Sequence, residues 1–486
     1  MLRSDVTVVG AGAAGLYTAL VAANAGARVT LISRSALAES ASYWAQGGIA
    51  AALAADDSVD RHLTDTLAAG RGSARVSAAR VLCQEAPERI RELADLGIAF
   101  DVNDSGGFLL GLEGGHATRR VAHAGGSETG RRITQRLSEL VIADERIEVL
   151  ERTTASELWQ AGERCVGIAA ERASGQRISV LSAATVLATG GAAALWERTT
   201  NPPGAIGGGL TLALATGAAL ADLELVQFHP TALVSDSGLD GFLITEAIRG
   251  EGAVLLNGAG ERFVDELAPR DQVSLAIEHV MEAGRNGRAA VMLDMRAVAL
   301  NRFSNVVETL RRAELDPRRD LVPVAPAAHY TMGGIVTDLD GRSSIGGLYA
   351  VGECACTGLH GANRLASNSL AECLVFGRRA ASAALGEPAP VTEPGLPPAA
   401  APSPPPTRAT RNALWRLAGI ERTPEGLSEL LRDESPLARS IAASALARAE
   451  SRGAHQRRDR PDADPSLDAM HAVVGNDSTP AFELWR

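Results

Sequence analysis

The sequence predicts an α/β fold built around a Rossmann-like nucleotide-binding domain. Three observations support this prediction: a glycine-rich turn between a strand and a helix near the N-terminus, a strand-rich stretch over residues 146–189, and a buried strand at residues 347–353 that ends in Gly-Glu. The 486 residues are 46% hydrophobic and 22% charged, enough to bury a large core. A chain of this length is expected to form about two or three domains.

The N-terminal segment indicates a strand, a turn, a helix and a second strand. Residues 5–9 form a valine-rich strand, residues 16–25 an Ala/Leu-rich helix and residues 28–33 the next strand. Glycines in the turn allow a tight bend, a close approach of backbone to pyrophosphate, and close helix–strand packing, and the helix N-terminus attracts phosphate. The residues expected to bind the dinucleotide there are Gly10, Ala11, Gly12, Ala13, Ala14 and Gly15.

The rest of the chain alternates between segments expected to be helical and segments that are more polar or rich in proline. Residues 78–97 and 208–220 are expected to be helical, and residues 408–452 to hold two or three short helices. A more polar segment, residues 223–330, lies between these helical parts. Residues 387–406 contain nine of the 22 prolines and indicate a stiff, extended linker.

The composition excludes several classes of protein. All 47 cationic residues are arginines, so the chain has no lysine for a Schiff base, a Walker-type phosphate loop or a protein kinase. The net charge of −11 argues against a nucleic-acid partner. No signal-peptide pattern or membrane-spanning apolar run is evident, so a cytoplasmic protein without a membrane partner is expected. Five cysteines without a CxxC pair indicate neither a metal site nor a disulfide framework.

The residues after the second strand leave two dinucleotides open. An acidic residue that binds ribose is expected about 20 residues after the turn, but the strand ends in Ser33 and Arg34. Arg34 would suit the 2′-phosphate of NADP, whereas the Ser33 hydroxyl could bind a ribose. Glu353 follows a glycine at a strand end, and in flavoproteins such a pair meets the ribityl chain. FAD is therefore the favoured cofactor.

Six further segments contain more reactive side chains than loops require. Each has a simpler interpretation by itself, since His-Pro pairs often form turns and neighbouring Arg and Asp residues often lie on the surface. The segments are Leu112–His116, Gln227–Thr231, Leu243–Gly252, Glu266–Asp271, His329–Gly334 and Gly358–Leu370.

Together, and in this order after the dinucleotide turn, these segments resemble the succinate dehydrogenase/fumarate reductase flavoprotein superfamily. The resemblance covers about residues 5–385 and, more loosely, the C-terminal helices. It implies a Rossmann-like FAD-binding domain with an inserted α+β capping domain, whose closure would exclude water, and a C-terminal helical domain. The implied boundaries are 1–222 and 331–386 for the FAD-binding domain, 223–330 for the capping domain, 387–406 for the Pro-rich linker and 407–486 for the C-terminal helical domain.

Two positions separate branches of this superfamily. Succinate dehydrogenases attach FAD to a histidine shortly before a Gln-Gly-Gly motif, but this chain has Ala41 there, so noncovalent FAD is expected. Dicarboxylate relatives tend to have a neutral amide where this chain has Glu113, a carboxylate that would pair with a substrate ammonium; its simpler interpretation is an exposed loop acid. The resemblance is therefore greatest to the branch that oxidises L-aspartate.

The resemblance also assigns substrate-binding roles. Arg364 would hold one substrate carboxylate through a bidentate fork. His229 and His329 would donate to carboxylate oxygens, and Thr245 would add a hydroxyl. Glu113 completes the set as the partner of the ammonium group.

Arg270 matches the proton-transferring arginine of the family. Because a free guanidinium has a pKa above about 12, proton transfer would need Asp271 or Glu246 as a relay; the alternative role of Arg270 is electrostatic. Glu246 is expected to orient a neighbouring histidine or arginine.

One departure concerns the cofactor. Relatives often have aspartate at the position of Gly208, and its absence predicts weaker FAD binding. Beyond the glycine turn, the expected FAD contacts are Ser33, Arg34, Ser40, Ser42, Gln46, Gly47, Gly48, Glu353, Asn368, Ser369 and Leu370.

The activity that the resemblance implies is oxidation of L-aspartate to iminoaspartate, with reoxidation of the flavin by O2, giving H2O2, or by fumarate. This would be the first step of de novo NAD biosynthesis through quinolinate, and the unstable imine suits a transient handover to quinolinate synthase. Two alternatives remain: a fumarate reductase-like or other soluble dicarboxylate dehydrogenase, and a degenerate flavoprotein that acts through its C-terminal helices.

Overall fold

The computed structural model describes residues 1–37, 39–284, 290–389, 402–475 and 479–486. Most of the predicted Pro-rich linker, residues 390–401, lies outside this described part. Within it, no helix is long and apolar enough to cross a membrane.

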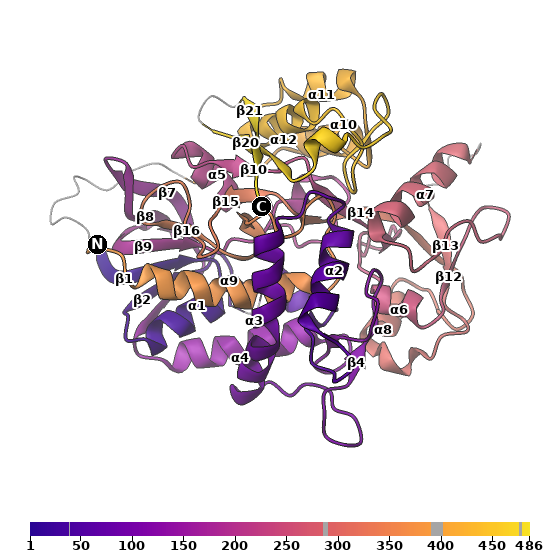
Figure 1. The fold of residues 1–486 in the computed structure, drawn as a ribbon, viewed down its shortest axis with the longest axis horizontal. Coiled ribbons are helices and arrows are strands. Elements are labelled where there is room, and N and C mark those ends of the chain that lie inside the picture. Colours follow the sequence, from indigo (N-terminus) through magenta and orange to yellow (C-terminus); the bar gives the residue numbers. More distant parts are fainter. Residues whose placement is uncertain (38, 285–289, 390–401, 476–478) are drawn as a thin grey trace.

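A seven-stranded sheet forms the centre of the main body of the molecule (Figure 1). Its core strands are parallel, and β1 is flanked by β2 and β9. Strands buried on both faces are continuously apolar, which explains the valine-rich β1. In sheet order the strands are β6 (Ile147–Leu150), β2 (Val29–Ile32), β1 (Leu2–Val9), β9 (Arg177–Leu187), β8 (Arg164–Arg172) and β7 (Thr153–Ala161), with β16 (Leu348–Ala350) also pairing with β9.

Five helices pack with this sheet in the main body. Helix α1 packs against both α4 and α9, and α3 packs against α9 and α2, so that one large apolar core lies between them and the sheet. The helices are α1 (Ala13–Asn24), α2 (Val59–Ala69), α3 (Val76–Asp95), α4 (Thr129–Ala143) and α9 (Asn368–Ala384). A small sheet of β3 (Ile49–Ala50), β5 (Val121–Ala122) and β4 (Leu110–Gly111) lies near α9.

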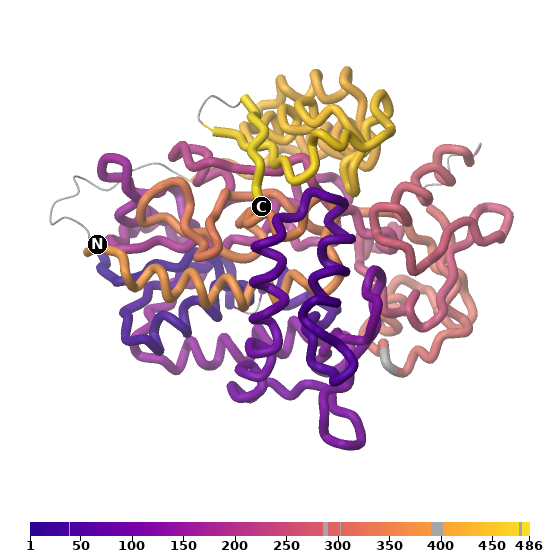
Figure 2. Tube along the Cα trace, in the orientation of Figure 1, coloured from indigo at the N-terminus to yellow at the C-terminus, as the bar shows by residue number. Residues whose placement is uncertain are grey.

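The polar segment of the sequence forms a separate unit with its own apolar core, residues 226–331, called the inserted unit below. It projects from one side of the main body in Figure 2 (salmon). Its antiparallel sheet runs in the order β11 (Val226–Leu233), β14 (Val322–Thr331), β13 (Val291–Asp294) and β12 (Val254–Leu256). Its helices are α6 (Glu246–Gly250), α7 (Arg270–Ala283) and α8 (Ser304–Arg312).

The predicted helix at 208–220 is shorter than expected. Helix α5 (Gly208–Ala215) ends because Gly217 adopts φ +77°, a left-handed conformation that glycine favours after a helix C-terminus. Leu220–Ala221 then forms strand β10.

The C-terminal segment contains the expected short helices and, in addition, a β-hairpin. Strand β20 of the hairpin pairs with β10, so the end of the chain completes a sheet that begins 250 residues earlier. The helices are α10 (Arg408–Leu417), α11 (Pro424–Leu430) and α12 (Pro436–Ala447). The sheet runs in the order β17 (Ala355–Cys356), β15 (Gly334–Val336), β10, β20 (Met470–Val474) and β21 (Pro480–Leu484).

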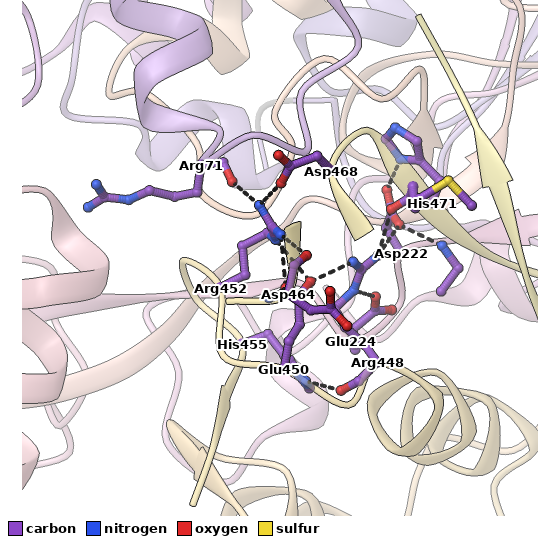
Figure 3. A network of polar contacts seen from close by, with 12 residues as sticks. Arg71, Asp222, Glu224, Arg448, Glu450, Arg452, His455, Asp464, Asp468 and His471 are labelled. Carbon is purple, nitrogen blue, oxygen red and sulfur yellow. Dashed lines mark hydrogen bonds and ion pairs between the residues drawn. The ribbon is translucent and has the colours of Figure 1, made fainter. Parts of the chain in front are cut away.

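Buried charges anchor this segment to the main body (Figure 3). Arg448 donates to Glu224 at 2.6 Å and to Glu450 at 3.1 Å, and Arg452 donates to both oxygens of Glu450 at 2.9 Å. Removing one partner of such a buried pair costs about 3–5 kcal/mol, because a charge is left without compensation. The network therefore holds the C-terminal segment in one position.

Candidate active site

The glycine turn between β1 and α1 has the geometry of a phosphate-binding loop. Gly10 has φ +112°, and a Cβ there would lie 2.1 Å from the Ala188 carbonyl oxygen; a Cβ on Gly15 would lie 1.9 Å from the Gly10 oxygen. Gly12 is the N-cap residue of α1, and no side chain of its own caps the helix. Ser42 Oγ accepts a hydrogen bond from Ala13 N, in the first turn, at 3.1 Å. The positive N-terminal end of the α1 dipole and the glycine backbone, which has no side chains in the way, fit a pyrophosphate.

Ser33 and Arg34 lie at the end of β2, where a dinucleotide ribose is expected. Arg34 Nη2 donates to the Gly204 carbonyl oxygen at 2.5 Å, which fixes the position of the guanidinium. Ser33 is buried.

Two predicted cofactor residues use their side chains within the protein. Asn368 Oδ1 bonds His62 Nε2 at 2.8 Å, and Asn368 Nδ2 donates to Thr66 Oγ1 at 3.1 Å. Ser40 Oγ accepts from Tyr43 N. No side chain caps the start of α9, so the backbone N–H groups of its first turn are free to donate. These groups, which include those of Ser369 and Leu370, are therefore the donors that fit a cofactor.

Another predicted cofactor residue has a buried polar atom without a partner in the described part of the chain. Gln46 donates from Nε2 to Leu243 O at 2.9 Å, but its Oε1 has no partner. Buried polar groups are normally satisfied, so this oxygen fits a polar ligand. Glu353 accepts from Thr331 N at 2.9 Å, and burial raises the pKa of Glu353 to about 7.

Gly47 and Gly48 leave room where a side chain would intrude. A Cβ on Gly48 would lie 2.4 Å from the Ala122 oxygen. A Cβ on Gly47 would lie 3.3 Å from Ser367 Oγ and 3.7 Å from Glu113 Oε1, so the cofactor motif borders the substrate residues directly.

Arg364 is a buried cation with few partners. Its Nη1 donates to Leu365 O at 3.4 Å, its Nη2 lies 3.3 Å from His329 Nε2, and its Nε has no partner in the described residues. Burial, followed by the charge of Arg270, lowers the pKa of Arg364 to about 10, which still leaves it charged at neutral pH. An anionic ligand would complete its coordination.

His229 and His329 lie on the neighbouring strands β11 and β14, with ring centroids 5.1 Å apart. Burial, with the nearby charge of Arg270, places the pKa of each histidine well below its ordinary value, so both rings are neutral. Thr231 N donates to His229 Nδ1 at 3.3 Å, which leaves the proton of the neutral ring on Nε2. His329 Nδ1 bonds Thr200 Oγ1 at 2.8 Å.

Glu113 lies inside this site, not on an exposed loop. It is 5% exposed, and its Oε2 accepts a hydrogen bond from Ser367 Oγ at 2.6 Å. Ser367 has φ +61°, a conformation that non-glycine residues rarely adopt and that is frequent at functional sites. Ser367 lies in the motif segment Gly358–Leu370, but the sequence predicts no role for it, because neither its backbone angle nor its contact is visible there.

Arg270 begins α7 and contacts two residues of the inserted unit. Its Nε donates to Glu246 Oε2 at 2.6 Å, and its Nη1 donates to Gln227 Oε1 at 3.0 Å. Burial alone would raise the pKa of Glu246, but the charges of Arg270 and Arg249 outweigh it and lower the pKa to about 2. Thr245, the residue before α6, is buried and makes no capping bond.

Of the two relay residues considered for Arg270, the structure supports only Glu246. The Asp271 carboxylate accepts from the Arg71 guanidinium at 3.0 and 3.2 Å. Consecutive residues at a helix start point in different directions, which is why neighbours in sequence are separated here. Glu246 also accepts from Gly114 N at 3.0 Å, so it bridges the inserted unit and the Glu113 loop.

The buried groups of the site offer partners of both charges to a ligand. Arg270 and Arg364 supply cations and Glu113 supplies a carboxylate. Two neutral histidines add hydrogen-bonding capacity without charge. A dicarboxylate that carries an ammonium would find a partner here for each of its charged groups.

Comparison with known proteins agrees with the fold. Residues 5–370 match the FAD binding domain family, and residues 428–484 match the fumarate reductase flavoprotein C-terminal family. A solved quinol fumarate reductase from E. coli superimposes with a TM-score of 0.88 at 29% identity, covering 99% of this chain and 97% of that one. The chain is therefore an FAD-dependent flavoprotein of the succinate dehydrogenase/fumarate reductase class.

Sequence relatives identify the branch. An L-aspartate oxidase from Caulobacter vibrioides is 45% identical over 487 residues, covering 94% of each chain, and one from Nostoc sp. is 48% identical over 392 residues, covering 78% of this chain and 67% of that one. The chain belongs to the L-aspartate oxidase family. The prediction of FAD as cofactor is confirmed. Noncovalent attachment stays a prediction that rests on Ala41 at the attachment position.

Proposed function

We propose that this chain oxidises L-aspartate to iminoaspartate, with O2 or fumarate as the acceptor that regenerates the oxidised flavin. The observation that carries the proposal is the buried position of Glu113 in the same site as Arg364 and Arg270. A carboxylate placed among guanidiniums offers a partner to an ammonium group, which succinate and fumarate lack.

Substrate binding follows from the donors that are free. Arg364 takes one substrate carboxylate through its unpaired edge. His229, as the Nε2–H tautomer, and Thr245 donate to carboxylate oxygens, and His329 lies beside Arg364 to orient the same group. Glu113, held by Ser367, accepts from the ammonium.

The reaction removes a hydride from Cα and a proton from the amine of aspartate. Bound FAD supplies the two-electron acceptor. Arg270 stabilises negative charge on the substrate and can exchange a proton only with Glu246, which its Nε already contacts. Glu246 in turn lies 3.7 Å from Arg249, an ion pair that helps to keep the Glu246 carboxylate ionised and able to accept a hydrogen bond from Arg270.

The inserted unit and main body must lie together for this site to exist. Gln46, Gly114 and Arg71 of the main body bond Leu243, Glu246 and Asp271 of the inserted unit. We assign the closed arrangement a gating role, in which it excludes water from the reacting centre.

A direct test compares substrates with the purified FAD-loaded enzyme. H2O2 release under air, and fumarate reduction without oxygen, are expected with aspartate. Robust oxidation of succinate with no turnover of aspartate would overturn the proposal and support the second candidate, a fumarate reductase-like dehydrogenase, which the structural likeness to a quinol fumarate reductase favours.

The cellular setting is part of the proposal. Iminoaspartate is the substrate for quinolinate formation, so we assign the enzyme to the start of de novo NAD biosynthesis in the cytoplasm. Because the imine hydrolyses in water, a transient handover to quinolinate synthase would protect it. The test compares two arrangements of this enzyme and quinolinate synthase: mixed in one compartment, or separated by a dialysis membrane that only small molecules such as the imine can cross. Handover predicts a higher yield of quinolinate when the two enzymes are mixed.

A further inference from the structure

The charge of Arg364 is compensated in an unusual way. A buried guanidinium normally requires a carboxylate partner, since the desolvation of an isolated charge is costly. Arg364 forms no ion pair within the described residues, and its polar contacts are a carbonyl oxygen at 3.4 Å and the neutral ring of His329 at 3.3 Å. The charges of Glu113 and Glu353 favour the charged form of Arg364 without contacting it. A group in direct contact must add to this stabilisation before substrate arrives.

That group is the aromatic ring of Tyr330. The guanidinium carbon of Arg364 lies 4.8 Å from the Tyr330 ring centroid, within the range of a cation–π interaction. Tyr330 is on β14, next to His329, and is 6% exposed. A ring face attracts a cation but cannot form the bidentate hydrogen bonds that a carboxylate would.

The hydroxyl of Tyr330 is held in a second buried cluster. It donates to Glu372 Oε2 at 2.6 Å, and His360 Nε2 bonds the same oxygen at 2.9 Å. Donation to a carboxylate shifts electron density towards the phenol oxygen and ring, which strengthens the attraction of the ring face for a cation. Glu372 thus acts on Arg364 through Tyr330 while remaining out of contact with it.

We propose that Tyr330 is a positioning residue for substrate binding: its ring stabilises and orients Arg364 while leaving the guanidinium edge free for the substrate carboxylate. This inference rests on the proposed function only in naming aspartate as the substrate. An internal carboxylate at this place would stabilise Arg364 equally well, but it would compete with the substrate for the same N–H donors.

The test uses the FAD-loaded enzyme and succinate, whose binding is followed by the change in flavin absorbance, together with the KM and kcat for aspartate. Tyr330→Leu is expected to weaken succinate binding and raise the KM by about tenfold or more, with a smaller change in kcat. Tyr330→Phe keeps the ring and should remain within about threefold of wild type. If the Tyr330 side chain only supported the fold, Tyr330→Leu would not differ from Tyr330→Phe in KM alone, without a matching difference in kcat.

Tyr349 provides a matched control. It is also fully buried, its hydroxyl donates to Glu387 at 2.6 Å, and Arg342 lies 6.0 Å from its ring, but it is on β16 and outside the site. Tyr349→Leu should lower stability as Tyr330→Leu does, yet leave succinate affinity unchanged.

A second series avoids the cavity that leucine creates. Phenylalanine carrying one, two or three ring fluorines at position 330 keeps the shape of the ring while progressively removing the negative potential of its face. Succinate affinity should fall stepwise with fluorination. Equal affinity across this series, or a Tyr330→Phe variant as weak as Tyr330→Leu, would overturn the proposal.

The outcomes separate this inference from the proposed function. If wild type fails to oxidise aspartate but succinate binding still depends on the ring, only the substrate assignment is wrong. If wild type oxidises aspartate and Tyr330→Leu binds succinate normally, only the role of Tyr330 is wrong.

Discussion

Arg71 donates from Nε and Nη2 to both carboxylate oxygens of Asp271, at 3.0 and 3.2 Å. Asp271 follows Arg270 at the start of α7 in the inserted unit, whereas Arg71 belongs to the main body. The carbonyl oxygen of Arg71 also accepts from Arg452 Nη1 at 2.7 Å (Figure 3). One residue therefore joins the main body, the C-terminal segment and the helix that carries Arg270.

Breaking this ion pair should loosen the closed site. For Asp271→Asn or Arg71→Ala, kcat/KM for aspartate is expected to fall by about five- to thirtyfold, because charge-assisted hydrogen bonds contribute about 1–2 kcal/mol. FAD content should be unchanged. Arg28→Ala, which removes an exposed pair with Asp5, is the control and should leave kcat/KM unaltered.

Arg270→Leu should abolish turnover while FAD stays bound. Loss of a group that transfers a proton and stabilises charge is expected to lower kcat by about 10²–10⁴. The measurement is H2O2 release beside the flavin absorbance of the purified protein. Arg311→Leu, at an exposed arginine of α8 in the same unit, should keep full activity. Turnover by Arg270→Leu at the wild-type rate would remove Arg270 from the mechanism.

Glu113→Gln should change selectivity more than stability. The amide cannot balance an ammonium, so the KM for aspartate is expected to rise by about 10- to 100-fold, whereas succinate, without an ammonium, should bind as well as before or better. Succinate titration of the same variant is the internal control. A parallel loss of both ligands would show that Glu113 supports the site without contacting the ammonium.

Gly208→Asp should tighten FAD binding several-fold, by supplying the acid that the family resemblance predicts at this position. The structure accommodates the change, because a Cβ on Gly208 has no atom within 4 Å and the residue lies in the first turn of α5, where acids are favoured. Gly209→Asp is the opposite case, since its Cβ would lie 2.1 Å from Thr189 Oγ1. FAD titration of the apoprotein distinguishes them. If the wild-type protein already retains stoichiometric FAD through gel filtration, the prediction of weak FAD binding is wrong.

Glu353 predicts a pH-dependent stability of the apoprotein. Its pKa is raised by burial from 4.5 to about 7, so between these values the folded state holds a proton that the unfolded state has released. Stability from this group is therefore present below pH 4.5 and lost as pH rises to 7, by about 3 kcal/mol. Denaturant unfolding of Glu353→Gln should show its advantage over wild type growing across this range. A constant difference would contradict the assignment.

Much of the nucleotide-binding half was predictable because its signals are local. The strand, turn and helix over residues 5–25 follow from valine content and glycine spacing, and the six motif segments supply the residues of the site. The β-hairpin at the C-terminus was not predicted, because β20 completes its sheet by pairing with β10, a strand about 250 residues earlier in the chain. Of the two relay residues that the sequence left open, Glu246 contacts Arg270, whereas Asp271 pairs with Arg71, because consecutive side chains at a helix start point in different directions.

The sequence by itself determined the chemistry that is available: a dinucleotide turn, guanidiniums in place of every amine, Glu113 and the two histidines. Only the tertiary structure decided which groups meet. Ser367 lies 254 residues from Glu113, and Asp271 lies 200 residues from Arg71, yet both pairs are in hydrogen-bond contact. Hydrogen bonds, ion pairs and ring contacts act over a few ångströms, so partners so far apart in the chain are set by the packing of whole units and not by spacing along the sequence.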